Sequence, residues 1–155
     1  MDLHEYFKRN GVVEIRNGWD GYENLENIIG KEVWICDYRI NDPNNKPIRS
    51  ISPKLARIFD NDDLPKNKIV YYSPIHFREV KGGKVLSTII APYDNTGYRH
   101  VSGKCVNIFE NKTDCINHFN GQLNKGIEQM QRYKDKQIKD IDAHIMSMKN
   151  LITKA

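Results

Sequence analysis

One short polar segment brings together residue types that could carry out catalysis. Asp94, Arg99 and His100 lie within the sequence DNTGYRH, and His76 precedes them. A carboxylate with two histidines can activate water against a phosphoester, so a phosphoesterase or nuclease is one hypothesis for this group. The alternative is a turn in which the Asp94 side chain hydrogen-bonds to its own backbone. Because neither a G-x-S-x-G motif nor a phosphate-binding glycine loop occurs, we expect no catalytic residues and no enzyme.

A second group contains the atoms that bind metals. Cys105, Cys115 and His118 have the spacing C-x9-C-x2-H, which differs from the spacings of structural zinc sites. All three fall where a strand or a helix is expected to face the core, so we expect no metal and no cofactor. Three cysteines without framework spacing favour reduced thiols and a cytoplasmic location.

A third group is basic and aromatic. The chain has a net charge of +4, and its middle part, residues 65–125, carries most of the excess of Lys and Arg. The candidate binding residues there are Arg78, Lys81, Lys84, Tyr93, Tyr98, Arg99, His100 and Lys104. Cations beside aromatic rings can contact phosphates and stack on bases. Alternatively, the lysines flank a solvated hairpin and the tyrosines pack at the rim of the sheet.

Two further aromatic residues lie among turn dipeptides. Trp19 and Tyr22 follow or flank Asn17-Gly18 and Asp20-Gly21. They could cover one end of the core, or they could form an exposed binding contact.

Short strands separated by turns must position these groups. Asp2 can cap a helix through Arg9 that stops at Asn10-Gly11. Paired glycines at 82 and 83 predict a tight hairpin. Strands are expected at residues 13–15, 31–40, 48–59, 67–74, 84–92, 98–101 and 105–109. Residues 75–80 either continue the strand at 67–74 or form a second strand after Pro74, and a helical turn after Ser52 is the alternative near Pro53. This pattern predicts an α+β protein with a small curved antiparallel sheet or SH3-like barrel over residues 1–112.

A single long helix is expected over residues 113–155. Thr113 is the expected N-cap, and apolar residues then recur every three or four positions, apart from a skip at Gln137. The first turns are expected to pack on the sheet, with a bend near Gly126. The helix would extend about 60 Å, which is longer than a small domain. We expect it to form a homodimeric coiled coil through Ile127, Met130, Ile138, Ile141, Ile145, Met148 and Ile152. The alternative is that the helix folds back along its own sheet.

Two absences in the sequence indicate the compartment. No apolar run approaches 18 residues, so we expect no membrane span. The first ten residues, MDLHEYFKRN, lack the features of a secretory signal.

Part of the chain resembles a known group of proteins. The run YYSPIHFREVKGGKVLSTIIAPYDNTGYR, followed by VNIFENKTDCINHFN, is similar to the small accessory proteins of AT-rich bacteriophage genomes. The resemblance covers roughly residues 30–125. It implies a curved sheet ending in a V-N-I-F strand, a capped helix, and a role in inhibiting or modifying a host machine such as a defence system, in the host cytosol. It implies no particular site residues.

Taken together, these patterns predict a non-enzymatic dimeric binding protein that engages a host protein or nucleoprotein complex. One alternative is sequence-tolerant nucleic-acid binding by the basic sheet. Another is a phosphoesterase centred on Asp94, His76 and His100. The direction of helix pairing stays open at this point.

Overall fold

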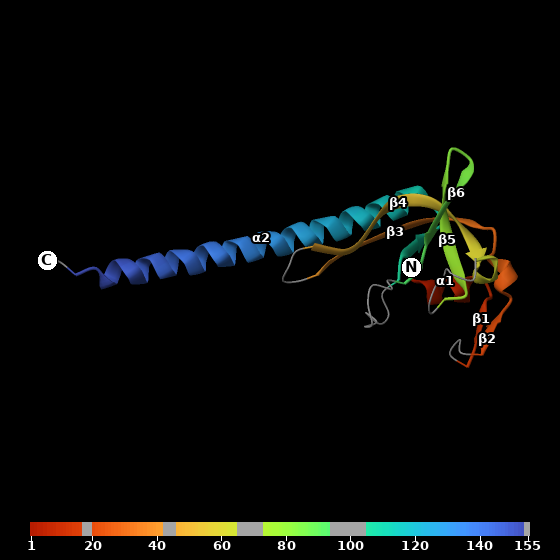
Figure 1. The fold of residues 1–155 in the computed structure, drawn as a ribbon, viewed down its shortest axis with the longest axis horizontal. Coiled ribbons are helices and arrows are strands. Elements are labelled where there is room, and N and C mark those ends of the chain that lie inside the picture. Colours follow the sequence, from red (N-terminus) through yellow and green to blue (C-terminus); the bar gives the residue numbers. More distant parts are fainter. Residues whose placement is uncertain (17–19, 42–45, 65–72, 94–104, 154–155) are drawn as a thin grey trace.

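The computed structural model describes residues 1–16, 20–41, 46–64, 73–93 and 105–153. Its centre is an antiparallel sheet with the strand order β6-β5-β4-β3-β7 (Figure 1). These strands are β3 (Glu32–Asn41), β4 (Lys46–Asp60), β5 (Ile75–Lys81), β6 (Lys84–Ile90) and β7 (Asn107–Phe109). A separate ribbon pairs β1 (Val13–Ile15) with β2 (Gly21–Glu23), and short 3-10 turns lie at Leu25–Asn27 and Asn61–Asp63. The chain begins with α1 (Leu3–Arg9) and ends with α2 (Lys112–Leu151), so the predicted α+β class is confirmed.

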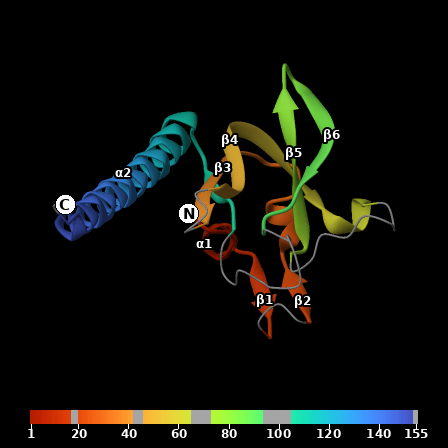
Figure 2. The same cartoon turned by 60° about the vertical axis from the view of Figure 1, so that its left-hand side comes forward.

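Glycines form the turn between β5 and β6. Gly82 and Gly83 have φ angles of +59° and +76°, a region in which residues with a Cβ are strained. Lys81 and Lys84 pair across this turn, as the glycine pair predicted. Figure 2 shows this hairpin extending away from the rest of the structure that precedes α2, which we call the head.

Pro53 lies inside β4 because the strand bulges there. Ile35 pairs with Lys54 and Asp37 with Ile51, so Ser52 and Pro53 lie together opposite Cys36. A proline has no N–H to donate, and bulges tolerate it. Residues 56–60 of β4 also pair with β5, so Pro53 lies outside the part of β4 that has partners on both sides. The predicted strand is therefore correct, and the helical turn is not formed.

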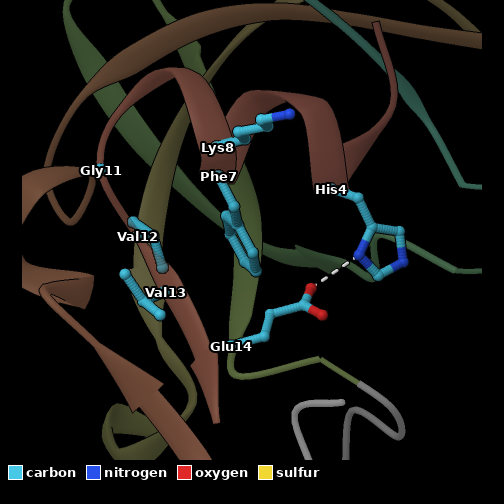
Figure 3. A pocket seen from close by; sticks show the side chains of 7 residues that line it. All are labelled: His4, Phe7, Lys8, Gly11, Val12, Val13 and Glu14. Carbon is cyan, nitrogen blue, oxygen red and sulfur yellow. Dashed lines mark hydrogen bonds and ion pairs between the residues drawn. The ribbon is translucent and has the colours of Figure 1, made fainter. Parts of the chain in front are cut away.

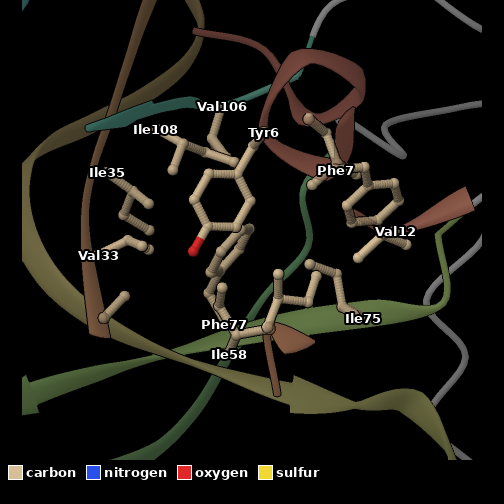
Figure 4. Packing of buried hydrophobic residues seen from close by; sticks show 13 residues of the cluster. Tyr6, Phe7, Val12, Val33, Ile35, Ile58, Ile75, Phe77, Val106 and Ile108 are labelled. Carbon is tan, nitrogen blue, oxygen red and sulfur yellow. The ribbon is translucent and has the colours of Figure 1, made fainter. Parts of the chain in front are cut away.

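The core lies between α1 and one face of the sheet (Figure 4). Asp2 caps α1 by accepting a hydrogen bond from the Glu5 amide at 2.8 Å. Leu3, Tyr6 and Phe7 are each 2% exposed and pack against alternate residues of the central strands. The core is completed by Val12, Ile28, Val33, Ile35, Ala56, Ile58, Ile75, Phe77, Val106 and Ile108.

The long helix begins two residues earlier than the expected cap implied. The Asn111 side chain accepts from the Asp114 amide at 2.8 Å and donates to the Asp114 carboxylate at 2.7 Å. The Asp114 N–H, which has no partner within the helix, is thereby satisfied, so Asn111, and not Thr113, is the N-cap. The prediction of Thr113 was wrong. Asp114 lies in the first turn, as expected.

The first four turns of α2, as far as Gly126, cover the face of the sheet opposite α1. The Cys36 thiol donates to the Cys115 carbonyl at 3.7 Å, and Tyr38 packs edge-to-face on Phe119 with ring centroids 6.0 Å apart. Hydrogen bonding to Cys115 and burial raise the pKa of the Cys36 thiol. Gly126 is the last buried residue of the helix, which continues through it without interruption. Beyond this point α2 extends away from the head to the C-terminus (Figure 1).

The described strands form an open sheet. After β6, the Pro92 carbonyl accepts from the Val106 amide at 2.8 Å, and Tyr93 forms an isolated bridge with Cys105. These contacts join the end of one edge strand to the start of the other. Closure into an SH3-like barrel stays a prediction. Residues 67–72 of the strand expected at 67–74, and the whole strand expected at 98–101, lie outside the described residues.

The part of the chain that the structure describes has no helix apolar over enough length to cross a membrane.

Candidate functional site

The distal part of α2 presents a long apolar surface to solvent. Every residue from 127 to 153 is exposed. The exposed fractions of the large apolar side chains range from 40% at Ile145 to 79% at Leu151. This group contains all seven predicted dimerisation residues, with three additions: Ile127, Met130, Tyr133, Ile138, Ile141, Ile145, Met146, Met148, Leu151 and Ile152. We call this group, without Met146, the tail seam. In a protein monomer such a surface would be unusual, because contiguous apolar patches of several hundred Å² normally mark interaction sites.

The tail seam continues the side of the helix that packs on the head. Each helical residue turns the direction by about 100°. On this basis Ile116, Phe119 and Leu123, which are half-buried against the head, point to the same side as Ile127 and Met130. The apolar stripe therefore has one partner, the head, as far as Gly126 and none among the described residues after it. Folding back of the helix along its own sheet is confined to the first turns.

The predicted basic patch is only partly described. Tyr98, Arg99, His100 and Lys104 lie outside the described residues, as do Trp19 and Asp94. Lys81 and Lys84 are exposed at the tip of the β5–β6 hairpin. Arg78 lies further back on β5, with its Cζ 4.8 Å from the centre of the Phe59 ring. The patch as a continuous binding surface stays a prediction.

His76 is enclosed on the outer face of the sheet, with both ring nitrogens engaged. Its Nδ1 lies 3.1 Å from Asn61 Oδ1, and its Nε2 accepts from Arg78 Nε at 3.2 Å. Phe59 stacks on the ring at 5.6 Å. Burial, with a smaller effect of Arg78, lowers the pKa of His76 to about 4. This arrangement holds a neutral histidine with its proton on Nδ1, which is typical of a structural role. Asp94 and His100 are not described, so the phosphoesterase hypothesis stays untested.

Comparisons with known proteins do not indicate a function. Comparison with family models, curated proteins and solved structures finds none that matches this chain. Any proposed function must therefore follow from the chemistry and geometry of the chain itself.

One polar constellation could not be anticipated from sequence spacing. Glu14 Oε1 lies 2.6 Å from His4 Nδ1, and the Tyr93 hydroxyl lies 3.4 Å from His4 Nε2. Figure 3 shows His4 and Glu14 facing each other. Both line a pocket of about 390 Å³ between α1 and β1. Burial, with smaller effects from Cys105 and Tyr22, raises the pKa of the Tyr93 hydroxyl. A hydroxyl with a raised pKa is a weak nucleophile, so the contact links α1, β1 and Tyr93 without activating an attacking group.

Tyr22 and Cys105 have structural neighbours. Tyr22 packs edge-to-face on Phe7 with centroids 5.4 Å apart, at the margin of the core. The Cys105 sulfur accepts from the Leu3 amide at 3.3 Å. Among the described residues, no three His, Cys, Asp or Glu side chains converge into a possible metal site.

Proposed function

We propose that this chain is a non-enzymatic binding protein that dimerises through α2 and presents two heads to a partner. The observation that carries the proposal is the tail seam, an apolar stripe interrupted by Lys134 that leaves the head at Gly126 and stays exposed to Ile152. A second copy of the chain is the simplest partner to cover the tail seam, because its own tail seam has the same length and the same spacing of apolar residues.

The partner of the two heads belongs to the same proposal. Resemblance to phage accessory proteins favours a host protein or nucleoprotein complex that is inhibited or redirected, in the host cytosol. The exposed Lys81 and Lys84 at the hairpin tip are candidate contacts on each head. Two linked heads gain avidity when both engage at once. SH3-like closure of the sheet would give each head the shape of a small barrel.

The solution mass tests the dimer. Sedimentation equilibrium should give twice the chain mass of 18.1 kDa at tens of micromolar. The double variant Ile138→Lys, Ile141→Lys should be monomeric with a folded head, whereas Lys136→Glu on the opposite side of the helix should stay dimeric. A monomeric unmodified protein would overturn the proposal.

The partner is tested by affinity capture from host lysate, with and without nuclease. A stable protein partner that survives nuclease and is lost with the monomeric variant supports the binding function. Capture that disappears with nuclease, together with affinity that falls steeply with salt, would favour direct nucleic-acid binding instead.

A further inference from the structure

We infer that two copies of α2 pair antiparallel over residues 127–152, which places the two heads at opposite ends of the shared rod. The inference rests on the proposed dimer and names its arrangement. Three features of the described helix bear on this direction: the position of the head and the charge of the two halves favour it over a parallel one, and the symmetry of the tail seam permits it.

The first feature is the position of the head. The head occupies the apolar side of α2 through Gly126, where Cys115 is buried and Phe119 contacts Tyr38. A parallel partner would lie on that same side and would bring its own head to the same end of the rod. Both heads would then compete for the space between the helices. In an antiparallel pair the C-terminal end of the second copy meets the first helix just where its head ends.

The second feature is the symmetry of the tail seam. Reversing the order of residues about the Lys139–Asp140 peptide places Ile127 opposite Ile152 and Ile138 opposite Ile141. Met130 then meets Met148, and Tyr133 meets Ile145, each within one residue of the same centre. An antiparallel pair therefore covers the exposed stripe, with apolar residues facing apolar residues at these positions and with Lys134 opposite Ile145 in the same register.

The third feature is the charge of the two halves. Residues 126–139 contain four Lys or Arg and two Asp or Glu, giving +2, whereas residues 140–152 contain one Lys and two Asp, giving −1. Antiparallel pairing sets each positive half against a negative half, while parallel pairing sets the two positive halves together.

The position of Lys134 within the stripe also favours antiparallel pairing. It occupies the place in the stripe between Met130 and Ile138, four residues from each. In a parallel pair the two Lys134 ammonium groups would face each other within the seam. In the antiparallel pair Lys134 lies opposite Ile145 of the second copy, with Asp142 of that copy one turn away.

Distances between nitroxide labels test the direction. A Cys105→Ser background removes the half-buried thiol, since Cys36 and Cys115 are buried. One label is attached at Gln129→Cys and, in a separate protein, one at Lys139→Cys; both positions are exposed and lie beyond Gly126, where the head ends. Antiparallel pairing offsets the two 129 labels by about 30 Å along the axis, giving roughly 35 Å between them, against about 20 Å in a parallel pair. The 139 labels lie near the centre of the pair and should be close in either arrangement.

A long distance at 129 with a short one at 139 supports the inference. A short distance at both positions would overturn it and leave the dimer intact. A monomer in the sedimentation experiment would instead defeat the proposed function itself, so the two failures are distinguishable.

Discussion

Arg49 forms an ion pair with the buried carboxylate of Asp37 and also hydrogen-bonds to the segment that follows β6. Its Nε donates to Asp37 Oδ2 at 3.0 Å, while Nη1 and Nη2 donate to the carbonyls of Ala91 and Pro92 at 2.8 and 3.1 Å. Asp37 is 1% exposed. One guanidinium therefore connects β3, β4 and the segment after β6, which in turn bonds to Val106 ahead of β7.

Replacing Arg49 should destabilise the head strongly. Arg49→Met removes the cation from a buried carboxylate and leaves two carbonyls without this donor, so we expect a loss of about 3–5 kcal/mol. Urea unfolding at one fixed protein concentration measures it. The matched control is Arg57→Met, which breaks the half-exposed Arg57–Glu32 pair at 2.7 Å and should lose less than about 1 kcal/mol. Equal losses in the two variants would contradict this account.

His76 should make the stability depend on pH below neutrality. Its pKa is about 4 in the folded protein, below its ordinary value of 6.5. The unfolded chain therefore binds the proton first, and the stability held above pH 6.5 is lost as the pH falls toward 4, by up to about 3 kcal/mol. His76→Gln should flatten this part of the stability profile. His144→Gln, at an exposed position, should leave it unchanged, and a profile equally steep in both variants would refute the assignment.

Two glycines should respond to alanine in opposite directions. Around Gly121 nothing lies within 4 Å of an added Cβ, so Gly121→Ala should stabilise α2 by up to about 1 kcal/mol through helix propensity. Gly82 has a φ of +59°, so Gly82→Ala should destabilise the hairpin by about 1–2 kcal/mol. Thermal unfolding followed by circular dichroism distinguishes the two. A gain in stability from Gly82→Ala would show that the turn has another conformation.

The two cap candidates of α2 can be separated by alanine substitution. Asn111→Ala should cost about 1 kcal/mol, because it removes both hydrogen bonds to Asp114. Thr113→Ala should be nearly neutral, since Thr113 is exposed within the first turn. Chemical denaturation of the two single variants provides the measurement, and the reverse order of effects would restore the cap expected from the sequence.

Local patterns were sufficient for most of the elements. The hairpin at Gly82-Gly83, the strand around Trp34 and the helix beginning at Leu3 depend on neighbouring residues, so they could be predicted from a short window. The N-cap of α2 could not be predicted in this way, because Asn111 and Thr113 are both good N-cap residues. The choice between them depends on where the chain leaves β7. The bulge at Pro53 depends on the register between two strands, which no single segment encodes.

The candidate site likewise has a part that could be predicted from the sequence and a part that could not. The tail seam was predictable because a period of three and four is visible in one segment, and the exposure of Ile138 and Ile141 agrees with it. Contacts such as His4 with Tyr93 join residues 89 positions apart, and no spacing rule connects them. Half of the predicted basic patch, namely Tyr98, Arg99, His100 and Lys104, falls outside the described residues, and the patch stays a prediction.

α2 is packed against the head up to Gly126 and exposed after it, so the two parts of this helix should differ in their stability against local unfolding. Amide hydrogens ahead of Gly126 are protected by the head and should exchange slowly at any dilution. Those after it belong to a segment of about 25 residues, which in isolation is only marginally helical in water. Their exchange should accelerate as the protein is diluted, so a residue-resolved deuterium-uptake series would show a step at Gly126 whose height follows mass action.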